Sequence, residues 1–259
     1  MDDMGGDRYI QSVFRALKMM EYIAECRQEA GLTEIGRGVG LSKSTTHGLI
    51  STLERCGYIR QNPATGKYSL GLKLFELGQA YAAGLDLREV ALPYLRELSA
   101  RYQETVHLAV LSEGDVVYID KVDGPLSIGI RSRVGGRNPA HCTGVGKVLI
   151  SAVDPKKLEL LYAGKTMKRF TEHTVTDWDT LRSELQKVRE VGYAWDREEF
   201  ENELWCVAAP VRDGSDTVAA AISLSGPAQR MKSTDREQVA ADVLNTAQKI
   251  SRQLGYRDG

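Results

Sequence analysis

Residues 32–58 of the 259-residue chain read LTEIGRGVGLSKSTTHGLISTLERCGY, and this stretch decides the fold of the N-terminal part. It predicts two short helices joined by a tight turn. The Thr33 hydroxyl can cap the first helix and the Ser42 hydroxyl the second. Gly40 stands between them, at a position where a left-handed residue readily ends a helix. We therefore expect a compact pair of helices around Gly40.

The two sides of the second predicted helix differ in composition. Helical spacing predicts a buried stripe, which consists of Thr45, Leu49, Leu53 and Cys56. The opposite side carries Lys43, Ser44, His47 and Ser51, with Thr46 and Ile50 at its edge. Hydroxyls and free N–H groups near a helix N-terminus suit phosphate oxygens and base edges. This spacing alone fits either a DNA-reading helix or a helical hairpin with an ordinary polar face.

The residues after this helix predict a β-hairpin. Residues 57–62 alternate as a strand, residues 63–66 form a Pro-Ala-Thr-Gly turn, and residues 67–70 return. A hairpin directly after a recognition helix is a wing, and Arg60 and Lys67 would flank the DNA backbone there. The combination of helix-turn-helix and wing favours DNA binding more strongly than either part does.

The run GLSKSTTHGLISTLERCGYIRQNPATGKYSLG, residues 40–71, resembles the DNA-binding domain of the IclR family of bacterial transcriptional regulators. The family pattern has Leu-Pro-Lys-Ser-Thr followed by His-Arg-Leu-Leu, whereas this chain has Ser42 for the proline and Gly48 for the arginine. Ser caps a helix as well as Pro begins one. Gly48 removes a long cation from the DNA-facing helix and costs roughly 1 kcal/mol of helix stability. This change alters the surface that would read the operator.

A further helix is predicted before this motif, with Ser12 as its cap. Its apolar stripe consists of Val13, Ala16, Leu17, Met20 and Ile23 or Ala24. Ser12 and Arg15 are free to touch backbone phosphate, although Arg15 fits an ordinary surface arginine equally well. The full set of candidate DNA contacts is Ser12, Arg15, Ser42, Lys43, Ser44, Thr46, His47, Arg60 and Lys67. We expect Ser44, Thr46 and His47 to read bases and the cations to bind phosphate.

Composition limits the class of protein. The formal net charge is −1, with 42% hydrophobic and 27% charged residues, as in an ordinary soluble globular protein. Residues 8–70 nevertheless carry a net charge of +4, from 9 Lys and Arg against 5 Glu. The four cysteines show no metal-like spacing, the N-terminus is acidic rather than a signal peptide, and no apolar run is long enough for a membrane span. We expect a cytoplasmic protein without metal or cofactor.

The whole chain predicts a mixed fold. We expect a winged helix-turn-helix domain (residues 8–70), a linker and dimerisation helix (71–86), and an α+β effector domain of GAF/PAS type with an antiparallel sheet (87–259). The linker is apolar on more than one side, so it would pair with its copy in another subunit. Strands are expected at 107–111, 116–120, 127–131, 192–195, 206–211 and 218–224, and helices at 144–152, 155–162, 177–192 and 234–254.

Two segments of the second domain carry potential chemistry. Residues 141–147, HCTGVGK, bring small residues to a helix start that could hold an anion, although the spacing is not that of a Walker sequence. Ser223 and Ser225 share one face of a strand, and Cys206 lies on another strand. They could line a small polar pocket. The residues alone favour the alternative, in which the serines pack on a small-residue layer and the cysteine belongs to the core.

The second domain also resembles the effector-binding domain of the IclR family. The matching pieces occur in family order and are Arg-Asn-Pro-x-His-Cys-Thr, Gly-Lys, Asp-x-Glu-Glu, Cys-Val-Ala-Ala-Pro-Val and Ser-x-Ser-Gly-Pro. The resemblance implies a small organic acid or an aromatic effector held by Thr143, Gly144, Val145, Asp196, Cys206, Ser223 and Ser225. Val145 and Trp205 depart from the usual residues and would reshape the cavity.

We therefore expect an effector-responsive regulator that binds a near-palindromic double-stranded DNA operator as a homodimer or a dimer of dimers. The alternative is a cysteine-dependent hydrolase with a DNA-binding appendage, using Cys206 as nucleophile, His141 or His107 as base and Asp196 as orienter. It is disfavoured because Cys206 lies in a hydrophobic strand. A metal-sensing repressor using His107, His141 and Cys142 lacks a known ligand spacing.

Overall fold

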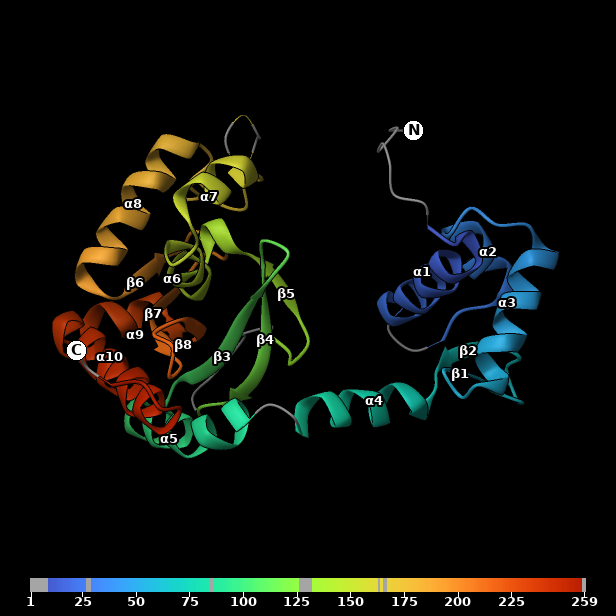
Figure 1. Ribbon diagram of the computed structural model, residues 1–259, viewed down its shortest axis with the longest axis horizontal. Coiled ribbons are helices and arrows are strands. Elements are labelled where there is room, and N and C mark those ends of the chain that lie inside the picture. Colours follow the sequence, from blue (N-terminus) through green and yellow to red (C-terminus); the bar gives the residue numbers. More distant parts are fainter. Residues whose placement is uncertain are drawn as a thin grey trace. The chain divides into compact units, whose positions relative to one another are not determined.

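The computed structural model describes residues 9–26, 29–83, 86–125, 132–162, 164 and 167–257 (Figure 1). The chain divides into two compact units, residues 1–85 and 86–259. Among the described residues, no helix combines the length and the apolar character needed to cross a bilayer.

The N-terminal unit is a winged helix-turn-helix. Its elements are α1 (Gln11–Glu25), α2 (Leu32–Gly38), α3 (Lys43–Arg55), β1 (Ile59–Gln61), β2 (Tyr68–Leu70) and α4 (Leu72–Ala83). The β1–β2 hairpin pairs Ile59 with Leu70 and Gln61 with Tyr68. A core that includes Met19, Ile35 and Ile50 joins α1, α2 and α3. The predicted helix pair and wing are thus confirmed.

The predicted caps are correct only in part. Ser42 caps α3, since its Oγ accepts a hydrogen bond from the Thr45 N–H, and Gly40 has the expected positive φ of 69°. The prediction of Thr33 as a cap was wrong, because α2 begins at Leu32 and its N-cap is Gly31, whose N–H donates to the Glu34 carboxylate. Ser12 was also wrong as a cap: Ile10 holds that position and its carbonyl accepts from the following turn of α1.

The buried face of α3 is rotated by one residue from the predicted stripe. Thr46, Ile50 and Leu53 are buried, whereas Thr45 and Leu49 are only partly buried and Cys56 is exposed. The reason lies on α2, where Gly36 leaves room for a side chain. A Cβ on Gly36 would stand 2.7 Å from the Thr46 Oγ1. The two helices therefore meet at Gly36, and Thr46 turns inward.

The predicted apolar stripe of α1 is also partly wrong. Its buried residues are Met19 and Ile23, while Val13 is 53% and Leu17 49% exposed. Phe14 is exposed as well and its ring lies 5.4 Å from that of Tyr9. The first half of α1 thus presents apolar side chains that the unit itself does not cover.

The described residues of the C-terminal unit form one antiparallel sheet of six strands in the order β5-β4-β3-β8-β7-β6. The strands are β3 (Thr105–Ser112), β4 (Asp115–Val122), β5 (Arg137–Pro139), β6 (Ala194–Arg197), β7 (Leu204–Arg212) and β8 (Val218–Pro227). The helices are α5 (Asp86–Tyr102), the 3-10 turn η1 (Ala140–Cys142), α6 (Gly144–Ser151), α7 (Pro155–Tyr162), α8 (Trp178–Val191), α9 (Ala228–Ser233) and α10 (Arg236–Gln253). The strand predicted at 127–131 lies outside the described residues, and β5 and α9 were not predicted.

Helices cover both faces of the sheet. Helices α5 and α10 pack on one face and α6 and α8 on the other (Figure 1). Along β7 and β8, Val207 and Leu224 point toward α5 and α10. Because side chains alternate along a strand, Cys206 and Ser223 point toward α6. Cys206 and Ser223 belong to a row of polar side chains, here called the polar row, on an otherwise apolar sheet. This row positions the candidate site.

Candidate functional site

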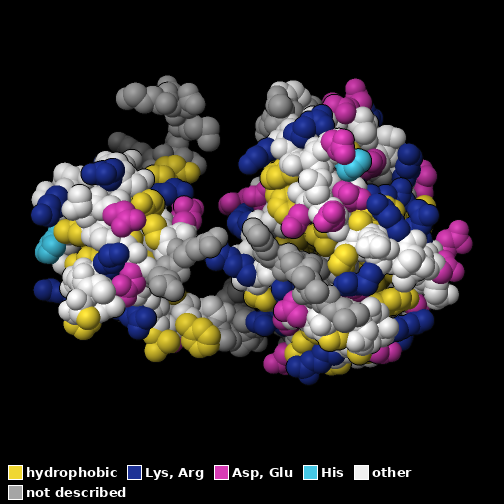
Figure 2. Space-filling model, turned by 180° about the vertical axis from the view of Figure 1, so that it is seen from behind, with side chains coloured by type: hydrophobic (Ala, Val, Ile, Leu, Met, Phe, Trp, Pro, Cys, Tyr) yellow, Lys and Arg dark blue, Asp and Glu magenta, His cyan; other side chains and the backbone are white. Residues whose placement is uncertain are grey.

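The exposed face of α3 is the first candidate site. Lys43, Ser44 and His47 are all exposed, and so is Gly48 on the same side of the helix. The Ser42 hydroxyl lies 3.2 Å from the Ser44 hydroxyl at the helix start. Figure 2 shows basic side chains and a histidine together at one edge of the N-terminal unit. Within the N-terminal unit, the side chains on the first turn of α3 are therefore exposed and accessible to a large partner.

Thr46 must be removed from the predicted base-reading residues. It is 0% exposed, and its hydroxyl donates a 2.8 Å hydrogen bond to the Ser42 carbonyl. The close approach of α2 at Gly36 turns this side chain inward. Thr46 therefore holds the two helices together and cannot reach a base edge.

The wing carries the two predicted cations on its surface. Arg60 and Lys67 are both exposed, and the Arg60 Nε donates to the Ser69 hydroxyl across the hairpin. The turn is held by Glu29, whose carboxylate accepts hydrogen bonds from Asn62 and Thr65. These two hydrogen bonds lower the pKa of Glu29, so the carboxylate that holds the turn is ionised at neutral pH. Ser12 and Arg15 on α1 are also exposed, and their contact with phosphate stays a prediction.

The second candidate site is a cavity of about 480 Å³ inside the C-terminal unit, between the start of α6, the polar row of the sheet and the β6–β7 segment. All seven residues predicted to hold an effector line it: Thr143, Gly144, Val145, Asp196, Cys206, Ser223 and Ser225. Further lining residues are His107, Tyr118, Ser132, Arg133, Gly136, Arg137, Asn138, Phe200, Glu201 and Leu204. The motifs are thus brought together, and their role in binding stays a prediction.

A histidine that was not among the predicted effector residues stands at the centre of the polar row. The His107 Nδ1 lies 3.4 Å from the hydroxyls of both Ser223 and Ser225, and the Nε2 lies 2.7 Å from the Ser132 hydroxyl. Burial, with a smaller contribution from the Lys121 charge, lowers the pKa of His107 to about 3. The imidazole is therefore neutral and has both a donor and an acceptor nitrogen.

The start of α6 forms the opposite wall of the cavity. Thr143 caps this helix, since its Oγ1 accepts from the Gly146 N–H and donates to the Pro139 carbonyl. A Cβ on Gly146 would stand 2.3 Å from the Ala140 carbonyl oxygen, so only glycine fits this turn. The first N–H groups of a helix have no intrahelical partner and favour a negative charge. The cavity wall at Gly144 and Val145 thus suits an anion.

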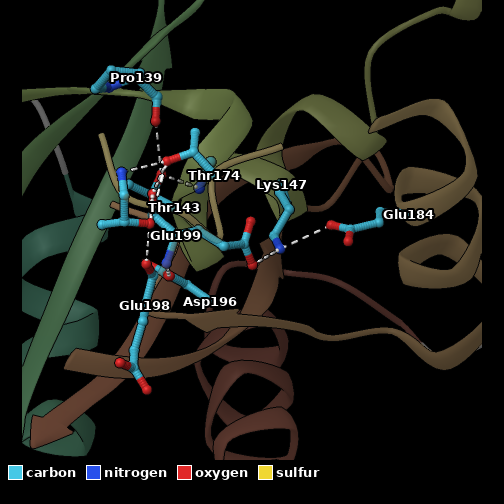
Figure 3. Close-up of polar contacts among 10 residues, drawn as sticks. Pro139, Thr143, Lys147, Thr174, Glu184, Asp196, Glu198 and Glu199 are labelled. Carbon is cyan, nitrogen blue, oxygen red and sulfur yellow. Dashed lines mark hydrogen bonds and ion pairs between the residues drawn. The ribbon is translucent and has the colours of Figure 1, made fainter. Parts of the chain in front are cut away.

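Buried charges gather behind this wall. Lys147 on α6 lies 2.6 Å from a Glu199 carboxylate oxygen and 3.0 Å from one of Glu184 (Figure 3). Burial alone would lower the pKa of Lys147, but the two glutamates together raise it. Asp196 is 2% exposed, and its Oδ1 accepts from the Glu199 N–H at 2.8 Å. Burial, together with the charge of Glu199, raises the pKa of Asp196 to about 7.

The structure does not assemble the Cys206, His141 and Asp196 arrangement of a hydrolase, whereas His107, the other candidate base, lines the same cavity as Cys206 and Asp196. The His141 Nε2 lies 3.1 Å from the Lys168 carbonyl, and His141 is not among the described residues that line the cavity. Burial, followed by the Asp196 charge, raises the pKa of the Cys206 thiol well above its usual value. The thiol is therefore protonated. Among the described residues, no cluster of three His, Cys, Asp or Glu side chains could hold a metal ion.

Both units are similar to known proteins. A family model described as "IclR helix-turn-helix domain" matches residues 12–63, and one described as "Bacterial transcriptional regulator IclR C-terminal" matches residues 79–252. The HTH-type transcriptional regulator XynR of Escherichia coli (strain K12) is 41% identical over 247 residues, which cover 95% of this chain and 98% of XynR. The transcriptional repressor IclR of the same organism is 32% identical over 248 residues, or 95% of this chain and 90% of that protein.

A solved structure agrees with these relatives. The crystal structure of an IclR homolog from Microbacterium hydrocarbonoxydans, complexed with 4-hydroxybenzoate, has a TM-score of 0.84 at 27% identity and covers 94% of this chain and 98% of its own. The resemblance seen in the motifs is thus confirmed over almost the full length. The chain belongs to the IclR family of bacterial transcriptional regulators.

Proposed function

We propose that this chain, a ligand-responsive DNA-binding regulator of the IclR family, represses transcription from a near-palindromic operator. It acts in the cytoplasm as a homodimer or a dimer of dimers. A small organic acid or an aromatic acid in the cavity of the C-terminal unit changes its affinity for the operator. The observation that carries this proposal is the open first turn of α3 beside an equally open wing.

We infer the DNA contacts from the side chains that are exposed on α3, on the wing and on α1. His47 and Ser44 face outward from α3 and can reach base edges in a major groove, while Lys43 can bind phosphate. Arg60 and Lys67 on the wing add phosphate contacts beside the groove. Ser12 and Arg15 are exposed on α1 and can contact the DNA backbone. Ser42 is exposed at the start of α3 and can do the same.

The effector site follows from the cavity. Its walls offer hydroxyls, a neutral imidazole and a helix N-terminus, which together suit a carboxylate on a small molecule. The 4-hydroxybenzoate in the complex from Microbacterium hydrocarbonoxydans supports an acid of this size. Because the Cys206 thiol is held in its protonated form, we propose binding without catalysis.

Oligomerisation is supported by apolar side chains that the N-terminal unit leaves uncovered. On α4, Leu72 is 70%, Phe75 62% and Leu77 46% exposed. A second copy of α4 would bury these side chains, and two-fold symmetry would then present two copies of α3 to the DNA. Helix α4 precedes the C-terminal unit in sequence, so an effector can alter DNA affinity only by favouring one dimer geometry.

A gel-shift titration with the DNA upstream of the chain's own gene tests this function. We expect binding that weakens with salt, a smaller salt dependence in Lys43→Ala because one phosphate contact is lost, and little binding in Lys43→Ala with His47→Ala. The matched control is Lys157→Ala, which removes an exposed cation from α7 in the C-terminal unit. Retardation that is equally strong in the double variant and the control would reject the assignment.

A further inference from the structure

Asp196 is a buried carboxyl group on the wall of the cavity, and it forms no ion pair with a cation among the residues that the structure describes. It lies on β6 and is 2% exposed. The nearest buried cation, Lys147, is already within 3.0 Å of both Glu199 and Glu184. The charge of one lysine is therefore matched by two glutamates before Asp196 is counted.

Among the described residues, the other cations near the cavity compensate Asp196 only weakly. Arg133 precedes β5 and Arg137 is the first residue of β5; both line the cavity, but both are exposed to water. The described partners of the Arg137 guanidinium are Ser112, Glu113 and Asp115 on the β3–β4 hairpin. An exposed guanidinium with such partners stabilises a buried carboxylate only weakly.

The remaining groups around Asp196 are acidic or neutral. Glu199 follows in the same segment, and Glu201 lines the same cavity. From β7 and η1 come the protonated thiols of Cys206 and Cys142, whose pKa values are raised by burial and by the Asp196 charge. From β3 and β4 come the neutral His107 and the Tyr118 phenol. The Glu199 and Phe200 N–H groups and the Lys147 charge favour an ionised Asp196, but burial and the Glu199 charge outweigh them and favour the neutral acid.

We infer that Asp196 recognises an anionic effector as a neutral carboxylic acid, donating its proton in an O–H···O⁻ hydrogen bond to the effector's carboxylate. This inference rests on the proposed effector function of the cavity. The carboxylate then lies between the Asp196 hydroxyl and the start of α6, where the Gly144 and Val145 N–H groups favour negative charge. An ionised Asp196 would instead repel the carboxylate.

The proton balance gives the inference a measurable consequence. Where Asp196 is ionised in the free protein, it must take one proton from solvent when the carboxylate binds. Burial, with the Glu199 charge, raises the pKa of Asp196 to about 7, so this uptake begins near neutral pH. Effector affinity is then constant below that pH and falls about tenfold for each pH unit above it.

The test uses the full chain and four probes: acetate, pyruvate, gluconate and 4-hydroxybenzoate. The ¹³C shift of the Asp196 carboxyl, assigned from its loss in Asp196→Asn, is followed across pH without and with each probe. We expect titration near neutral pH in the free protein and a higher apparent pKa with a bound probe. In calorimetry, Asp196→Asn should bind the probe without pH dependence, because the amide donates at every pH.

Glu201→Gln is the matched control, because it removes another acid from the same cavity and should keep the tenfold loss per pH unit. An Asp196 that titrates as an ordinary surface carboxyl, or probe affinity that does not change across neutral pH in the wild type, overturns the inference. Binding of none of the four carboxylates overturns it too. Proton uptake without any change in DNA affinity would instead refute the proposed function and leave the inference standing.

Discussion

Replacement of Asp196 by Asn should make the C-terminal unit more stable at neutral and alkaline pH. Burial and the Glu199 charge raise the pKa of Asp196 from 3.8 to about 7. The folded state therefore retains a proton that the unfolded chain loses. Stability from this group is complete below pH 3.8 and is lost as the pH rises toward about 7.

The size of the effect follows from that shift. Three pKa units correspond to about 4 kcal/mol between the bottom and the top of the window. Asn keeps a neutral polar group at the position but does not titrate. The difference in unfolding free energy between Asp196→Asn and the wild type should therefore grow by several kcal/mol from about pH 4 to about pH 8 and then stay constant.

Urea unfolding followed by tryptophan fluorescence measures this difference. The three tryptophans, Trp178, Trp195 and Trp205, all lie in the C-terminal unit, so the signal reports on the unit that contains Asp196. Glu201→Gln serves as the control and should track the wild type. A gap between Asp196→Asn and wild type that is the same at every pH would refute the reasoning about the buried proton.

Three further changes test the packing and the assembly. Lys147→Met should lower the unfolding free energy by about 3–5 kcal/mol in urea titrations, because it leaves buried carboxylates unpaired. Adding Glu199→Gln should restore part of this loss, and additive losses in the double variant would contradict the pairing. Gly36→Ala should lower the unfolding free energy by about 1–3 kcal/mol, because the added methyl group clashes with the Thr46 hydroxyl. Adding Thr46→Ala should remove this clash, and a double variant that is no more stable would place the clash elsewhere. Phe75→Glu should shift the chain toward monomer in sedimentation velocity, because the exposed ring belongs to the proposed α4 interface; unchanged oligomers would exclude that interface.

Most helices and strands could be predicted, because the caps, turns and periodic patterns that mark them lie among neighbouring residues of the sequence. The helix predicted at 177–192 is α8, where Asp177 accepts from the Thr180 N–H at the start and Gly192 ends the helix with a φ of 81°. The inward turn of Thr46 was not predictable in the same way. Thr45 and Thr46 are chemically identical neighbours, and the choice between them depends on Gly36 of another helix.

The cavity shows the same division between local and long-range information. Strand spacing singled out Cys206 and both serines, the resemblance to the IclR family added Asp196, and the structure brings these residues to one cavity. His107 was predicted only as an alternative base of a hydrolase and not as an effector-binding residue, although its alternating strand was recognised. It meets Ser223 only because β3 pairs with β8, across 116 residues of sequence. Strand order is set by packing of the whole unit and has no local signature.

Base preference at the operator tests the central claim most directly, namely that the exposed first turn of α3 reads DNA. Relative affinities for every single-base variant of the operator would be measured for wild type, His47→Ala and Lys43→Ala. We predict that His47→Ala loses discrimination at symmetric positions of the two half-sites, by about 1–3 kcal/mol. Lys43→Ala should weaken all sequences alike. Unchanged base preference and affinity in both variants would contradict the account.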